Sequence, residues 1–261
     1  MPTLVSETIE APNGDRYRLL WKLAFFHPRL CESQAWTFAW SFLVGAVCLV
    51  FVVLDSIVAR GAAEPNWHFE LSSWVQVSFL MMCFFRIFFG FSYFNRDTYQ
   101  LRTDREPLNW LMKCFWVLYD VSITTNIGLV LPYFLVLSFD PQRPNGITIT
   151  SHLLFCVFAF ADLVLFRVPL QKSHWIFTVL FLLLFFVVSI GQHSWYGLET
   201  PVYDKLDWSK KPTQAVLWVF GLAAYFAALH AFLVSLVLCR DVPGDALEHD
   251  PPFRAVQLGG A

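Results

Sequence analysis

Six long apolar runs dominate this chain, and only short charged or turn-forming segments separate them. The runs fall at 35–58, 71–94, 111–139, 147–166, 174–195 and 214–239. An apolar run of about 18 residues or more can cross a bilayer as a helix. Charged residues make up 15% of the 261 residues, whereas soluble domains carry about a quarter. The runs therefore predict an all-α, polytopic membrane protein built as a bundle of six transmembrane helices.

Basic residues predict the orientation of these spans. Lys and Arg are concentrated before the first run, between the second and third, between the fourth and fifth, and after the sixth. The cytoplasmic segments of membrane proteins normally carry this excess. We therefore expect a cytoplasmic segment at 1–34, a membrane domain at 35–239 and a cytoplasmic tail at 240–261, in the endoplasmic reticulum or the plasma membrane.

The remaining composition narrows the function. The net charge of −2 offers no basic surface for nucleic acid. The six cysteines show neither metal-ligand spacing nor a disulfide framework, and we expect no metal and no other cofactor. An ionisable side chain at the centre of a membrane span costs about 2.5–3.5 kcal/mol. The polar residues inside the runs therefore need a structural or functional role that offsets this cost.

Two of these residues are predicted to form an ion pair. Arg86 in the second run and Asp120 in the third lie at similar depths. We expect them to pair and to fix the register of their helices, and loss of one partner would be costly. His230 lies at a similar depth in the sixth run, where we expect a packing histidine with its hydrogen bonds satisfied.

A second set of polar residues lies near the opposite, outer ends of the runs. Ser72 begins the second run, His152 begins the fourth and His193 ends the fifth. A hydroxyl and an imidazole in one layer can support nucleophilic acyl transfer, with amides such as Gln76 or Gln192 holding the oxyanion. The same layer is also consistent with polar residues that only anchor helix ends, and spacing alone leaves both interpretations open.

The sixth run carries small residues at helical spacing, which allow helices to approach closely. They are Gly221, Ala224, Ala228 and Ala231. This pattern indicates either packing inside the bundle or the contact face of a homodimer.

The stretch 151–208 carries a pattern that resembles a known family. Its elements are His152, Asp162 ten positions on, an Arg-x-Pro turn, a second histidine, and the closing sequence VYDKLDW followed by Lys-Pro. The pattern is similar to the rolling stone family of six-span membrane proteins. That family is in turn similar to the androgen-induced family of membrane hydrolases, which cleave fatty-acid esters of hydroxy fatty acids with a threonine and a histidine. The resemblance covers 67–240.

The resemblance implies roles for particular residues. His152 falls at the catalytic histidine position and Asp162 at the acidic position after it. The family reads Leu-Thr-Asn-Trp where this chain has Leu-Ser-Ser-Trp at 71–74, which puts Ser72 at the threonine position. The implied activity is a lipid-ester hydrolase within membrane lipid, in which Ser72 attacks and His152 acts as the base. The supporting residues would be Gln76, Asp162, Gln192 and His193.

Rolling stone itself is associated with muscle cell fusion. A second hypothesis is therefore a non-enzymatic membrane protein in cell-surface contact, fusion or trafficking, with 196–213 as its partner surface. A transporter lined by Arg86, Asp120 and His230 is a third. It ranks lower because the chain shows no inverted repeat.

Overall fold

The computed structural model describes residues 34–61, 70–94, 110–137, 146–166, 168, 170–196 and 206–240. In these ranges every regular element is a helix, which confirms the all-helical prediction. The elements are α3 (Gln34–Gly61), α4 (Leu71–Phe94), α5 (Trp110–Pro132), the π-helical turn η2 (Tyr133–Leu137), α6 (Gly146–Leu165), the 3₁₀ turn η3 (Lys172–His174), α7 (Trp175–Tyr196) and α8 (Pro212–Arg240). The predicted cytoplasmic segments were 1–34 and 240–261, and apart from Gln34 and Arg240 their residues lie outside the described residues.

Five of the described helices are long and apolar enough to cross a membrane. Their apolar windows are Trp36–Ile57, Leu71–Phe88, Lys113–Leu135, Lys172–Gly191 and Pro212–Val237. The apolar part of α6, Ile149–Leu165, is shorter. This is the build of a multi-pass membrane protein, whereas the count of six spans and the orientation of the termini stay predictions.

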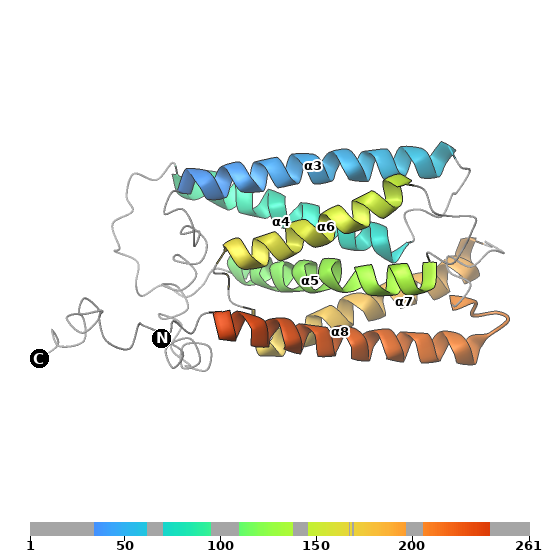
Figure 1. The fold of residues 1–261 in the computed structure, drawn as a ribbon. Coiled ribbons are helices and arrows are strands. Elements are labelled where there is room, and N and C mark those ends of the chain that lie inside the picture. The colour runs from blue at the N-terminus through green and yellow to red at the C-terminus, as the bar shows by residue number, and fades with distance from the viewer. Residues whose placement is uncertain are drawn as a thin grey trace, which may run out of the picture.

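The helices alternate in direction, and α5 lies at the centre of the bundle. Helices α3, α5 and α7 run one way, and α4, α6 and α8 return (Figure 1). Helix α5 packs against α4, α6, α7 and α8. We call the end where α5 and α7 begin the His174 end, and the end where α4 and α6 begin the Ser72 end.

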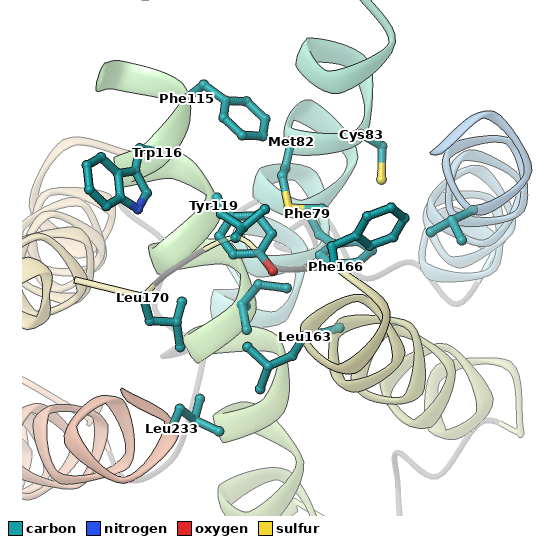
Figure 2. Close-up of a cluster of buried hydrophobic side chains, with 14 of the residues drawn as sticks. Phe79, Met82, Cys83, Phe115, Trp116, Tyr119, Leu163, Phe166, Leu170 and Leu233 are labelled. Atoms are coloured by element: carbon teal, nitrogen blue, oxygen red, sulfur yellow. The ribbon is translucent and has the colours of Figure 1, made fainter. Parts of the chain in front are cut away.

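The central position of α5 follows from its sequence. Every residue from 119 to 126 is buried, although this stretch includes Asp120, Ser122 and Asn126. Polar side chains inside a membrane have to face protein, so a helix that is polar on several sides has to be surrounded by other helices. Figure 2 shows the apolar cluster beside this stretch, in which Phe79 and Phe166 lie close to Tyr119.

Two glycines show which side of α8 faces the bundle and which side faces away from it. A Cβ atom on Gly128 of α5 would lie 2.5 Å from Phe226 Cε1 and 2.6 Å from Leu229 Cδ2, both on α8. A Cβ atom on Gly221 would meet nothing within 4 Å. Gly221, Ala224, Ala228 and Ala231 are all exposed. The small-residue stripe therefore does not pack inside the bundle, and the homodimer stays a prediction.

A short turn leads into α8. Asp207 Oδ1 accepts hydrogen bonds from the Ser209 hydroxyl at 2.7 Å, the Lys210 amide at 2.9 Å and the Ser209 amide at 3.1 Å. These bonds, first the one from the Ser209 hydroxyl, lower the pKa of Asp207. Leu206, beside this turn, joins an apolar cluster with Leu71 at the start of α4. The turn therefore fixes the entry to α8 against the Ser72 end.

Candidate functional site

A buried ion pair joins α4 to α6 near the His174 end. Arg86 Nη1 and Nη2 donate to Asp162 Oδ1 and Oδ2 at 2.6 and 2.7 Å, and Trp40 Nε1 on α3 donates to Oδ1 at 3.2 Å. The guanidinium lies over the Phe166 ring, 4.7 Å from its centroid. A bidentate arginine–carboxylate pair is the strongest geometry that these two groups can form. The pair ties three helices together.

The predicted pair of Arg86 with Asp120 is therefore wrong. Asp120 and Asp162 both lie at the depth of Arg86, and depth alone does not choose between them. Asp120 faces the connection between α6 and α7 and bonds to that segment. Asp162 was also predicted to support His152, but it lies ten residues along α6, which is about 15 Å. The structure does not bring Asp162 to His152.

Asp120 instead belongs to a cluster that links α5, η3 and α8. We call Asp120, Thr124, Gln171, His174 and His230 the Asp120 cluster. Asp120 Oδ2 lies 2.6 Å from His174 Nδ1 and accepts the Gln171 amide at 3.1 Å. His230 Nε2 lies 2.9 Å from the Gln171 carbonyl oxygen, and His230 Nδ1 lies 3.0 Å from Thr124 Oγ1. The hydrogen bonds pin the connection between α6 and α7 to both neighbouring helices.

The partners of His230 determine its tautomer. A carbonyl oxygen can only accept, so Nε2 carries the proton that it donates to Gln171. In the neutral ring, Nδ1 then accepts from the Thr124 hydroxyl. Both ring nitrogens are used, and His230 is completely buried. The prediction of a packing histidine with satisfied hydrogen bonds is confirmed.

Sequence reasoning missed His174 and Gln171 as partners of Asp120. Gln171 falls in the predicted joint between two spans and His174 is the first residue of the fifth run, and the assignment of Asp120 to Arg86 left His174 without a partner. The available signal was the second histidine of the family pattern, which stands directly at this joint.

At the Ser72 end, a second polar set comes from α4, α6 and η2. We call Ser72, Gln76, Tyr133, Ser151 and His152 the His152 layer. Gln76 Nε2 donates to Ser151 Oγ at 3.2 Å, and the Tyr133 ring lies against the His152 ring with centroids 3.9 Å apart. Tyr133 begins the π-helical turn directly after Pro132. Such turns are often found at functional sites.

Two atoms of the His152 layer have no partner. His152 Nε2 and Gln76 Oε1 are buried and make no hydrogen bond with any described residue. Buried polar groups are nearly always paired, since an unsatisfied group costs about 1–3 kcal/mol. This layer therefore has hydrogen-bonding capacity that the described fold does not use.

Ser72 is near this layer but is not bonded to the histidine. Ser72 Oγ donates to Glu70 Oε2 at 3.2 Å, and no hydrogen bond joins Ser72 to His152 within the described residues. Ser72 precedes Gln76 by one helical turn on α4, so the two lie on one face. Glu70 was missed because it precedes the predicted span. Gln192 and His193 lie in α7, but their side chains are outside the described residues.

Within the described residues, five helices of membrane-spanning length and composition surround buried polar clusters, which is the architecture of helical multi-pass membrane proteins. No family model, no curated protein and no solved structure matches this chain.

Proposed function

We propose that this chain is a six-span membrane protein of the rolling stone-like family, with cytoplasmic termini, that hydrolyses a lipid ester with Ser72 and His152. The observation that carries the proposal is the unpartnered Nε2 of His152, buried at 4% exposure. A general base needs a nitrogen that no structural hydrogen bond occupies. His230, whose two ring nitrogens are both bonded, cannot serve in this way without losing them.

The proposed chemistry follows from the side chains of the His152 layer. The Ser72 hydroxyl turns from Glu70 toward the substrate, its oxygen forms a bond to the acyl carbon, and its proton passes to His152 Nε2. The Gln76 amide stabilises the negative charge on the carbonyl oxygen. The carbon–oxygen bond to the alcohol then breaks, and His152 returns the proton to that alcohol. Water hydrolyses the acyl-serine by the same steps and frees the fatty acid.

The position of the layer favours a lipid substrate. Ser72 is the second residue of α4, so the layer lies close to the end of the bundle. On α6, Leu153 directly follows His152 and Val157 lies one turn further on, and these side chains are 44% and 60% exposed. In a membrane this apolar surface faces acyl chains. A lipid could therefore enter sideways, with its chains against α6 and its ester in the layer.

One observation favours the second candidate, a non-enzymatic membrane protein in cell-surface contact, fusion or trafficking. The bond between Ser72 and Glu70 satisfies the hydroxyl without the imidazole. In that case the layer anchors helix ends, and the segment after α7 forms the partner surface.

The experiment is labelling of the purified full chain in detergent with a fluorophosphonate, together with turnover of a panel of lipid esters. Ser72→Ala and His152→Ala are compared with Ser73→Ala, which replaces the neighbouring buried serine. We expect Ser72→Ala and His152→Ala to lose labelling and turnover, and Ser73→Ala to keep both. Absence of labelling and turnover in folded wild-type protein would favour the non-enzymatic candidate.

A further inference from the structure

The Asp120 cluster holds an oxygen atom that none of its own hydrogen bonds uses. Asp120 is completely buried, and its Oδ2 accepts from both His174 and Gln171. Its Oδ1 has no partner among the described residues. A buried carboxylate normally has both oxygens bonded. The unbonded oxygen lies ten residues along α5 from Trp110, about 15 Å into the helix.

A second unbonded oxygen lies on the neighbouring helix. Thr178 is completely buried, and its Oγ1 has no partner among the described residues. In this same structure, Thr125 and Thr150 donate to the carbonyl one turn back, at 2.7 Å each. Thr178 does not make the equivalent bond. Its position four residues after His174, the partner of Asp120, places it on the side of α7 that faces the cluster.

Thr124 supplies a third oxygen with unused acceptor capacity. It stands one turn beyond Asp120 on the same face of α5. Because the Thr124 hydroxyl donates to His230 Nδ1, its two lone pairs remain available. Asp120 and Thr124 both connect to Gln171, Asp120 directly and Thr124 through His230. The Asp120 and Thr124 oxygens therefore belong to one hydrogen-bonded cluster, and the position of Thr178 one turn after His174 puts its oxygen on the side of α7 that faces this cluster.

The charge of the cluster selects the kind of ligand. Arg86 and Asp162 balance one another, whereas the Asp120 carboxylate inside the bundle is balanced by His174 only when that histidine carries a second proton. Hard cations prefer oxygen ligands, and the available atoms are one carboxylate and two hydroxyl oxygens. A divalent ion would leave a positive charge buried, and the described residues offer no group of three His, Cys, Asp or Glu side chains. We propose that Asp120, Thr124 and Thr178 bind one sodium ion.

The backbone around the cluster suits such a site. The chain at Val168, Leu170 and Gln171 is not helical, yet Val168 and Leu170 are buried. Non-helical backbone inside a membrane bundle is tolerated only where protein or a polar site surrounds it, and interrupted helices often coordinate ions in membrane proteins. This site uses none of the residues assigned to ester hydrolysis, and its test needs no turnover measurement.

The test is thermal unfolding of the full chain in detergent as NaCl replaces N-methylglucamine chloride at constant ionic strength and constant pH. We expect a saturable rise of the midpoint with sodium in the wild-type protein. Asp120→Asn should lose this response. Thr178→Val removes one ligand without a change of shape and should raise the half-saturating sodium concentration about tenfold, as expected for a loss of about 1.4 kcal/mol.

Thr125→Val is the matched control, because Thr125 is equally buried but donates to its own helix. It should keep the wild-type response to sodium. If Asp120→Asn does not fold, the comparison of Thr178→Val with Thr125→Val decides. The proposal is overturned if the midpoint is the same in both salts, if Thr125→Val weakens the response as much as Thr178→Val, or if only pH moves the midpoint. That last result would mean that a proton on His174 balances Asp120.

Discussion

Two buried histidines at opposite ends of the bundle make a direct comparison. His230, near the His174 end, bonds through both ring nitrogens to Thr124 and Gln171. The ring of His152, at the Ser72 end, lies tilted against the ring of Tyr133, and its Nε2 makes no hydrogen bond with any described residue. A buried hydrogen bond between helices holds them in register, whereas a buried donor or acceptor that makes no such bond is free to bind a ligand. Burial alone therefore does not distinguish these two histidines, but hydrogen bonding does.

The largest effect should come from the ion pair between Arg86 and Asp162. Arg86→Met leaves the Asp162 carboxylate buried without its cation, so we expect a loss of about 3–5 kcal/mol of stability. Thermal unfolding in detergent measures it. The double variant Arg86→Met/Asp162→Leu should recover most of the loss, and Lys113→Met, at an exposed position, should change little. An unchanged midpoint in Arg86→Met would mean that the pair is not structural.

The second-largest effect on stability should come from a packing defect between α5 and α8 that changes no polar group. In Gly128→Ala the new Cβ atom would meet Phe226 and Leu229 at 2.5 and 2.6 Å. We expect this overpacking to destabilise the protein by about 1–3 kcal/mol. Gly221→Ala on α8 has open space around it and should gain up to about 1 kcal/mol from helix propensity. Equal effects of the two substitutions would contradict the α5–α8 contact.

These predictions depend on features that the sequence reveals unevenly. The apolar runs predict the helices well: the second run, 71–94, coincides with α4. Depth along a helix follows from residue position, so Ser72, Gln76 and His152 were correctly expected near one end. Direction around a helix depends on which helices are neighbours, and that choice decides whether Arg86 meets Asp120 or Asp162. In the sequence, Pro132 is the only indication of the π-helical turn that brings Tyr133 against His152.

The His152 layer should tolerate loss of its amide. Gln76→Leu breaks the bond to Ser151 but also removes an unpartnered buried oxygen, so the two effects oppose one another. We expect stability to change by less than about 1 kcal/mol, while ester turnover falls because the oxyanion loses a donor. A large fall in the unfolding midpoint would instead assign Gln76 to the structural set.

The smallest effect should come from the turn at Asp207. Hydrogen bonds from the Ser209 hydroxyl and then the Lys210 amide lower the pKa of Asp207 below its ordinary value of 3.8. A lowered folded-state pKa contributes stability above the unfolded pKa, and this contribution is lost as the pH falls through the folded pKa. Unfolding midpoints measured from pH 7 downward should show a small acid step below about pH 4 in the wild-type protein. Asp207→Asn should lack this step. An acid profile in the variant identical to that of the wild-type protein would rule out Asp207 as the cause of the step.

The most direct test of the comparison is to measure ester turnover and the unfolding midpoint together in His152→Leu and His230→Leu. His152→Leu should keep the wild-type midpoint and lose turnover. His230→Leu should lower stability by about 1–3 kcal/mol, because the Gln171 carbonyl and the Thr124 hydroxyl lose their partner, and should keep turnover at temperatures where it is folded. A lower midpoint with unchanged turnover in His152→Leu would contradict the account, because it would make His152 the structural histidine.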